Sequence, residues 1–279
     1  MRDLFEEIWS NIRRNKLRTA LTGFAVAWGI FMLIFLLGAG NGLIHALESN
    51  NNDYMTNTMN VWGGYTSKPY NGMREGRRID LNDKDIDITL GPDFADNVEK
   101  AGTILTQASL TTSYGKEYIV KQVSGVSPEY SEMNKLSLLY GRFINEIDIK
   151  ERRRVIVMDS NDARELLGVT GEKEEGLTAL QKAAAAEALV GKYVKINSSM
   201  FQVIGILRPN ENGWSSLYAP ITTIRTIYNR GKEIDEYTFS FHGLDTEEDN
   251  RAFEDRLRAS LNKNHNAAPD DKRAVGIWN

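Results

Sequence analysis

The stretch that decides the architecture is 19-TALTGFAVAWGIFMLIFLLGAG-40, which contains no charged residue. At a helical rise of about 1.5 Å per residue it would extend about 33 Å, and the hydrocarbon core of a membrane is about 30 Å thick. The first proline of the chain is Pro69, so no proline kinks this stretch. The run is longer than the apolar core of a cleaved signal peptide, which is about 7–15 residues. We therefore predict one transmembrane helix over residues 17–47.

Charged residues flank this span unevenly. The first charges after it are acidic, Glu48 and Asp53. Four basic residues stand at its start: Arg13, Arg14, Lys16 and Arg18. Basic residues concentrate on the cytoplasmic side of a membrane span. The prediction is an inner-membrane protein with a cytoplasmic N-terminus and a periplasmic region from residue 48 onward.

Small residues recur at intervals of four along the span. Gly23 with Ala27, and Gly38 with Gly42, are the pairs that we take as candidate helix-packing positions. In lipid, small residues at this spacing let two helix backbones approach closely. The alternative is a lone anchor, because such pairs also arise by chance in a span rich in Gly and Ala.

Residues 1–16 precede the span with an amphipathic pattern. Such a pattern, with aromatic residues on one face and basic residues at its end, is typical of a helix at the inner membrane surface. A simple extension of the span is the alternative. The candidate membrane-interface residues are Leu4, Phe5, Ile8, Trp9, Ile12, Arg13, Arg14, Lys16 and Arg18.

Composition and missing motifs narrow the function. The chain has 279 residues, of which 41% are hydrophobic and 26% are charged, and this composition is typical of a globular protein. Its formal net charge of -4 lacks the excess of basic residues that is typical of a nucleic-acid-binding protein. It has no cysteine, which excludes disulfides and thiolate metal sites. Gly191-Lys192 lacks the rest of a phosphate-binding loop. The three histidines, His45, His242 and His265, have no carboxylates at ligand spacing. We expect no enzyme activity, no catalytic residue, no cofactor and no metal.

The region after the span has alternating helix and strand periods, which predict an α+β domain without internal repeats. The predicted strands are 59–63, 103–114, 118–126, 153–158, 193–196, 201–207, 236–241 and 274–278. The predicted helices are a short one capped by Asn82, and 94–101, 159–167, 173–189, 220–229 and 246–261, with a polar linker at 262–272.

Several segments resemble one family, the MacB-type ABC transporter permeases, which include the lipoprotein-releasing permeases. The start, 11-NIRRNKLRT-19 with Leu21-Thr22, is similar to the family's first transmembrane segment. The later segments are similar to its periplasmic core: Tyr140-Gly141-Arg142-Phe143-Ile144 with Asp148, Val155 to Ser160 with Leu166-Leu167-Gly168, Val190-Gly191-Lys192, 201-FQVIGIL-207, and Tyr218-Ala219-Pro220-Ile221. The stretch 170–189 is longer than the family pattern.

The resemblance implies a non-catalytic permease subunit that transmits movement. Two copies would flank two ABC ATPase subunits in the cytoplasm. The nucleotide-driven closure of these subunits would shift the first helix and the periplasmic domain during export or extrusion. It implies a porter-like part over 48–140 and 215–279, interrupted by a smaller β-rich subdomain over 141–214. It leaves open a periplasmic adaptor and an outer-membrane channel as partners. Because the family continues into three further spans, we expect a piece of a longer, multi-pass protein.

A bitopic sensor with an extracytoplasmic ligand-binding domain is the alternative from another class. The head before the span is only about 18 residues long, so no signalling domain precedes it. An anchored hydrolase is a third possibility, but the sequence contains no hydrolase motif. The sequence after Asn279 in the parent gene would separate permease from sensor.

Overall fold

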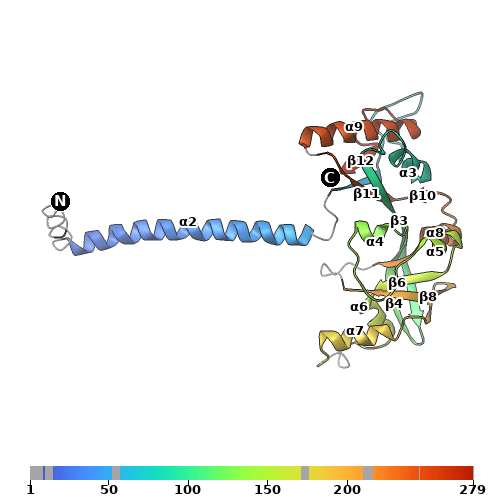
Figure 1. Cartoon of the computed structure of the whole chain (residues 1–279), viewed down its shortest axis with the longest axis horizontal. Coiled ribbons are helices and arrows are strands. Elements are labelled where there is room, and N and C mark those ends of the chain that lie inside the picture. The colour runs from blue at the N-terminus through green and yellow to red at the C-terminus, as the bar shows by residue number, and fades with distance from the viewer. Residues whose placement is uncertain are drawn as a thin grey trace. The chain divides into compact units, whose positions relative to one another are not determined.

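The computed structural model describes residues 9, 15–51, 57–170, 176–209, 216–244 and 246–278. It divides into two compact units, Met1–Asp53 and Tyr54–Asn279. The first unit contains α2 (Lys16–Asn51), an uninterrupted helix of 36 residues that is drawn in blue in Figure 1. The second unit contains a large mixed sheet with short helices packed on it.

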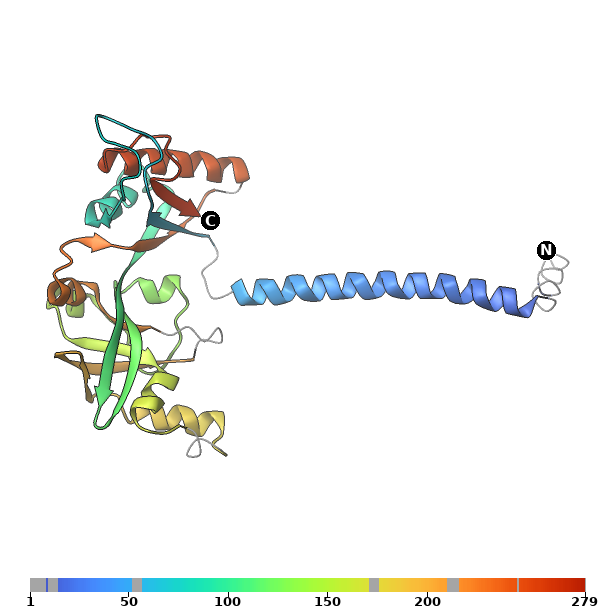
Figure 2. The same cartoon turned by 180° about the vertical axis from the view of Figure 1, so that it is seen from behind.

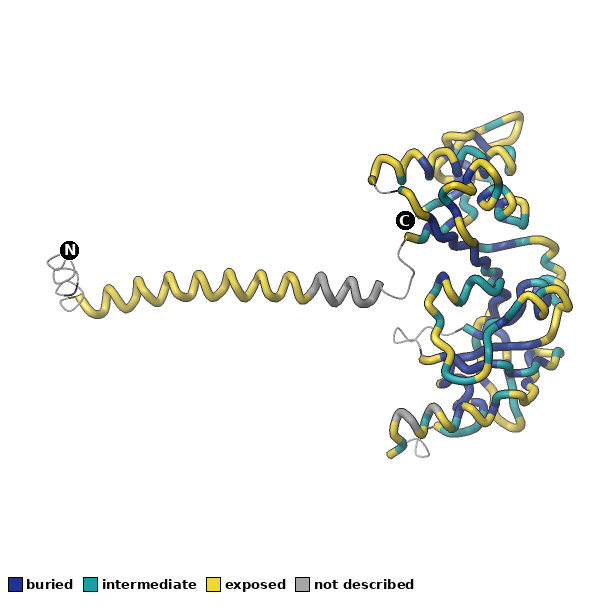
Figure 3. Tube along the Cα trace, viewed as in Figure 1, coloured by how far each residue is buried: buried dark blue, intermediate teal, exposed yellow. Residues whose placement is uncertain are grey.

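Among the described residues of its own unit, the helix α2 has no apolar partner. Its segment Lys16–Gly42 is long and apolar enough to cross a membrane, and none of it is buried. Figure 3 colours this helix as exposed up to Gly42, where its described burial ends. A water-soluble helix would bury one stripe of its surface, whereas this helix is apolar on all sides, which is typical of a membrane span. The predicted apolar N-terminal helix is confirmed.

Ten strands form the main sheet of the second unit. In chain order they are β1 (Thr58–Gly63), β3 (Val98–Tyr114), β4 (Glu117–Val126), β5 (Leu138–Gly141), β6 (Val155–Asp159), β7 (Tyr193–Ile196), β8 (Ser199–Leu207), β9 (Leu217–Pro220), β11 (Glu236–Phe241) and β12 (Val275–Trp278). Their order across the sheet is β12-β1-β11-β3-β4-β9-β6-β8-β5, and β7 pairs with both β3 and β8. A separate two-stranded sheet joins β2 (Leu81–Asn82) to β10 (Glu233–Ile234).

The hairpin of β3 and β4 connects the two ends of the main sheet. The first half of β3 pairs antiparallel with β11, at Thr103 opposite Tyr237, and its far end pairs with β7, at Thr112 opposite Ile196. The last residues of β4 pair in parallel with β9. Figure 2 shows the two long strands running through the middle of this unit. The predicted hairpin is confirmed and is longer than its pattern.

The helices cover the sheet at separate places. They are α3 (Asp83–Thr89), α4 (Tyr130–Met133), α5 (Glu146–Lys150), α6 (Ser160–Leu166), α7 (Ala179–Glu187), α8 (Ile221–Tyr228) and α9 (Glu247–Asn264). α3 and α9 lie near β11 and β12, whereas α6 and α7 lie at the other end (Figure 1). The predicted cap at Asn82 is confirmed, because its side chain accepts from the N–H of Lys84. At the start of α6 the side chain of Asp159 accepts from the N–H of Asn161.

A continuous apolar core runs beneath both ends of the sheet. At one end Phe253 of α9 packs edge-on against Phe94, with ring centroids 5.6 Å apart, and contacts Phe239 of β11. At the other end Ile156 and Phe201 are buried in the same cluster. A second, small cluster consists of Val126, Ile144, Val157 and Leu207.

The predicted helix over residues 94–101 is wrong. Phe94 to Asn97 form a single turn, and β3 begins at Val98. In β3, Ala101 pairs with Phe239 of β11. The hydrophobic period of an eight-residue segment does not distinguish a helix from a strand. In this segment the strand conformation is determined by pairing with the distant strand β11.

Other boundaries also differ from the prediction. Over the expected helix 173–189, α7 begins only at Ala179, where a capping box joins Thr178 to Gln181; residues 171–175 lie outside the described residues. α9 runs to Asn264, into the expected linker. The short strands β5 and β9 were not predicted, because four residues carry no readable period. The division at 141–214 stays a prediction; β6, β7 and β8 from this stretch lie in the main sheet.

Candidate functional site

The predicted membrane-interface residues fall largely outside the described residues. This holds for Leu4, Phe5, Ile8, Ile12, Arg13 and Arg14. Trp9 has helical backbone and an exposed side chain, 66% accessible. Lys16 and Arg18 lie in the first turn of α2 and are exposed. Their interfacial role remains a proposal.

The helix-packing candidates have free space around them. A Cβ added at Gly23, Gly38 or Gly42 would meet no atom within 4 Å, and Ala27 is exposed. The described residues of this unit supply no second helix for these positions, so their role in helix packing stays a prediction.

An aromatic row occupies one side of α2 and adds a feature that the sequence reading missed. Phe24, Trp28, Phe31 and Phe35 follow one another with ring centroids 5.6–6.3 Å apart. Gly38 and Gly42 continue the same alternation of steps of three and four, so they lie on the same side. Gly23 and Ala27 lie one residue before Phe24 and Trp28, on the neighbouring side of the helix.

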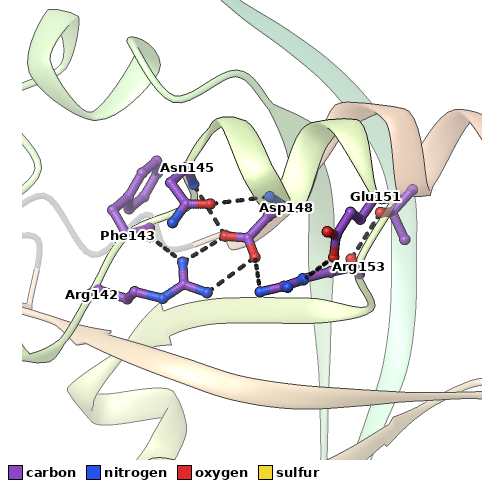
Figure 4. Close-up of polar contacts among 7 residues, drawn as sticks. Arg142, Phe143, Asn145, Asp148, Glu151 and Arg153 are labelled. Atoms are coloured by element: carbon purple, nitrogen blue, oxygen red, sulfur yellow. Dashed lines mark hydrogen bonds and ion pairs between the residues drawn. The ribbon is translucent and has the colours of Figure 1, made fainter.

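A polar centre in the second unit is built by the segment between β5 and β6. Asn145 caps α5 by accepting from the N–H of Asp148, and Asp148 accepts in return from the N–H of Asn145. Asp148 is fully buried. Its Oδ2 lies 2.5 Å from Nη1 of Arg142 and its Oδ1 lies 3.0 Å from Nη2, so the guanidinium binds in a two-pronged way. Figure 4 shows this arrangement.

Arg153 approaches the same carboxylate from the other end of α5. Its Nη1 lies 3.8 Å from Oδ1 of Asp148, and its Nε donates to Glu151 at 2.8 Å. Burial opposes the charged form of Asp148, but the hydrogen bonds from Arg142 and from the Asn145 backbone outweigh it and lower its pKa. The hydrogen bond to Asp148 likewise raises the pKa of Arg142. The pair therefore stays ionised at neutral pH.

Two segments of the family pattern meet directly at this centre. Gly141 of β5 pairs with Gly205 of β8, and the N–H of Arg142 donates to the carbonyl of Ile204 at 2.9 Å. A Cβ on Gly141 would lie 2.1 Å from that carbonyl oxygen, and one on Gly205 would lie 2.3 Å from the Arg142 oxygen. Gly141 also has a φ of 77°, which favours glycine. Both glycines are thus required by close backbone approach.

The segment around Pro220 joins the same place. Pro220 ends β9 and precedes α8, whose first turns attach to the α5 region. Thr222 donates from its hydroxyl to the carbonyl of Ile149 at 2.7 Å, and Thr223 to the carbonyl of Arg153 at 2.9 Å. The family-like segments around Arg142, Gly205 and Pro220, which are separate in the sequence, therefore form one structural centre. Its arginines, a buried carboxylate and tight backbone contacts hold β5, α5, α8 and β8 together.

His265 has a carboxylate partner that its sequence spacing hid. Its Nε2 lies 2.9 Å from both oxygens of buried Asp85, a residue 180 positions away, and Asn264 also donates to Asp85. Asp85 belongs to the capping box of α3, so the contact ties α3 to the end of α9. Among the described residues, no three His, Cys, Asp or Glu side chains gather as metal ligands would.

Two solved structures share the fold. The periplasmic region of MacB from Actinobacillus actinomycetemcomitans superposes with a TM-score of 0.59 at 19% identity, over 82% of this chain and 91% of that one. The extracellular domain of the noncanonic ABC-type transporter YknZ from Gram-positive bacteria superposes with a TM-score of 0.60 at 19% identity, over 80% of this chain and 100% of that one. The α+β expectation for the second unit is confirmed.

Sequence relatives carry the same kind of name. The macrolide export ATP-binding/permease protein MacB of Psychrobacter arcticus is 27% identical over 224 residues, which cover 76% of this chain and 30% of that protein. Its counterpart in Neisseria meningitidis serogroup A is 24% identical over 75% of this chain and 30% of that protein. The chain thus spans about a third of these relatives.

The family model described as MacB-like periplasmic core domain matches residues 19–260. The match includes the apolar part of α2, the Arg142–Asp148 centre and most of α9. The chain therefore belongs to the family of ABC transporter permeases with a MacB-like periplasmic core domain.

Proposed function

We propose that this chain is the part of an ABC transporter permease that carries movement from a cytoplasmic ATPase to the periplasmic side of the membrane. The observation that carries this proposal is the continuity of α2. The segment of α2 that is apolar enough to cross a membrane is Lys16–Gly42, and the helix continues without interruption to Asn51. A continuous helix moves as a stiff rod, so a displacement at its cytoplasmic end would reach the start of the periplasmic unit.

The proposed topology follows from charge. Lys16 and Arg18 lie at the start of the span and Glu48 is the first charge after its apolar run, so the proposed N-terminus is cytoplasmic and the proposed place of the second unit is the periplasm. The proposed membrane is the inner membrane, with residues 1–16 on its inner surface. The proposed partners are an ABC ATPase and a second permease copy, which would pack at the small residues of α2. A periplasmic adaptor and an outer-membrane channel are proposed on the family resemblance alone.

The proposed cargo is exported or extruded, as the names of the relatives imply for those proteins. The chain itself is proposed to be non-catalytic. The Gly-Lys pair at Gly191-Lys192 stands between α7 and β7 and lacks the other residues of a phosphate-binding loop. Purified chain that hydrolyses ATP, with contaminating ATPases removed, would contradict this part. The family match favours the permease over the bitopic sensor.

The stiffness of α2 beyond the span provides the test. Ala46→Pro removes a helical hydrogen bond and inserts a clash, at a cost of about 3 kcal/mol, without changing chain length or register. Ala46→Leu keeps the helix and serves as the matched control. Both belong in the complete permease with its ATPase in lipid nanodiscs.

The readout requires no knowledge of the cargo. The 279-residue sequence contains no cysteine, so the substitution Lys116→Cys in the β3–β4 turn introduces a single position in it for attachment of a spin probe. We expect the distance between the probes of two copies to change on trapping ATP in the Ala46→Leu protein and to change much less in the Ala46→Pro protein. Equal changes in both would rule out transmission through α2, and no change in either would rule out a nucleotide-driven periplasmic movement.

A further inference from the structure

A cavity of about 410 Å³ opens beside the Arg142–Asp148 centre. Its lining residues come from β6, β7 and β8, from the two residues that precede β6 and from the residue that follows β5. Three of its lining side chains are cationic: Arg142, Arg153 and Arg154. No acidic residue is among the described residues that line it. A cavity of this volume is in the range of small-molecule sites.

The arginines are held in different ways. The carboxylate of Asp148 contacts the guanidinium groups of both Arg142 and Arg153 (Figure 4), and Asp148 is not among the residues that line the cavity. Each of these two side chains is still more than two-fifths exposed, so part of each guanidinium faces solvent. Arg154 makes no ion pair with any residue that the structure describes, and it is exposed. Two anchored arginines and one uncommitted arginine thus share one opening.

The remaining wall is apolar and uncovered. Tyr193 of β7 is 58% exposed and Met200 of β8 is 47% exposed, and both line the cavity. Tyr193 pairs with Gln202, which also lines it. Exposed aromatic and thioether side chains next to arginines match a ligand with an anionic head and an apolar body.

We propose that this cavity binds the anionic group of an amphipathic small molecule, a phosphate monoester or carboxylate attached to an aromatic or alkyl group. The guanidinium groups donate to the anion, since a planar fork of N–H donors fits carboxylate and phosphate oxygens. The ring of Tyr193 and the side chain of Met200 contact the apolar group. Asp148 is a positioning residue, because it orients two arginines without facing the ligand.

The fold does not require Arg154 in the way that it requires Arg142. Arg142 is bound to buried Asp148 and to the carbonyl of Phe143, whereas Arg154 has neither contact. Arg154→Gln therefore removes cavity charge without opening the core. Arg152→Gln removes the same charge two residues away, from an exposed side chain that does not line the cavity. These two variants form a matched pair.

The probe is phenyl phosphate, titrated calorimetrically into the full chain in phosphatidylcholine nanodiscs at about 0.15 M salt, where screening acts beyond roughly 8 Å. We expect saturable binding, weakened about fivefold or more by Arg154→Gln and by less than twofold by Arg152→Gln. Phenol should not bind, and inorganic phosphate should bind more weakly than phenyl phosphate.

The proposal would be overturned if phenyl phosphate showed no saturable binding, or if both substitutions lowered its affinity equally. Either result would mean that the arginines attract anions only by long-range electrostatic attraction and form no defined site. Nanodiscs that contain phosphatidylglycerol distinguish the source of the anion. A loss of apparent affinity for phenyl phosphate there identifies a lipid headgroup as the competing occupant, and an unchanged affinity identifies a soluble ligand; both outcomes support an anion site.

Discussion

The carboxylate of Asp148 is fully buried, yet it lies 2.5 Å from a guanidinium nitrogen of Arg142, whose side chain is 42% exposed. The pair therefore joins the interior of the second unit to its surface, because one partner is desolvated and the other reaches solvent. The same carboxylate closes the capping box of α5. One side chain thus fixes both the start of a helix and the direction of an arginine.

Removing the charge of Asp148 is expected to destabilise the second unit. Asp148→Asn loses the charge-assisted bonds to Arg142, which predicts a loss of about 2–3 kcal/mol in the free energy of unfolding. Glu151→Gln removes an equal charge from a half-exposed partner of Arg153 and should cost less than about 0.5 kcal/mol. Thermal and urea unfolding followed by tryptophan fluorescence would measure both. Equal costs would show that the burial of Asp148 is unimportant.

The stabilising effect of Asp148 should depend on pH in the acid range. Its pKa in the folded state is lowered, so it contributes stability that is complete above its unfolded pKa of about 3.9 and is lost as pH falls through the folded value. The difference in unfolding free energy between the natural protein and Asp148→Asn should be constant from pH 7 to 5 and should shrink below pH 4. A difference that grew on acidification would have the wrong sign.

Gly141 and Gly115 allow two physical reasons for a glycine to be compared, a positive φ and a close approach of another backbone segment. Both have positive φ, 77° and 63°, but a Cβ at Gly115 meets nothing within 4 Å, whereas one at Gly141 meets the carbonyl of Ile204 at 2.1 Å. Gly115→Ala should cost only the backbone term of about 1–2 kcal/mol. Gly141→Ala should cost about 1–3 kcal/mol more, because the backbone must shift. Chemical unfolding of the two variants tests this, and similar costs would contradict the close contact.

The small residues of α2 should matter for assembly and not for insertion. Replacing Gly23 and Ala27 together with Leu keeps the span apolar, so membrane insertion should be unchanged. The added bulk should block close approach of a partner helix and lower assembly with the ATPase or transport in the complete protein. The same double change at Gly38 and Gly42 compares the outer pair, which continues the aromatic row. Wild-type assembly and transport after the first change would leave that side of α2 as a simple anchor.

Reporter fusions test the orientation. Alkaline phosphatase is active only outside the cytoplasm, so a fusion near residue 10 should be inactive and a fusion near residue 100 should be active. The charge distribution around the span is the physical reason. The reverse pattern would place the second unit in the cytoplasm and contradict both the proposed topology and the proposed transmission.

The sequence by itself determined the features that depend on neighbouring residues. The uncharged run at 19–40 specifies an apolar helix that is long enough to span a membrane. The side chains of Asn82 and Asp159 cap the helices that follow them and so specify where these helices begin. The β3–β4 and β7–β8 hairpins were readable because their alternation flanks short turns. All of these signals lie within one element or one turn.

The tertiary structure alone decided what depends on distant residues. Whether 94–101 was helix or strand depended on pairing of Val98 and Ala101 with β11, more than a hundred residues later. The cavity exists because the end of β5 and the start of β6 place three arginines beside Tyr193 of β7 and Met200 of β8. Burial and register, which only packing sets, turned separate polar residues such as His265 and Asp85 into partners, because a side chain finds its contact through space and not through its spacing along the chain.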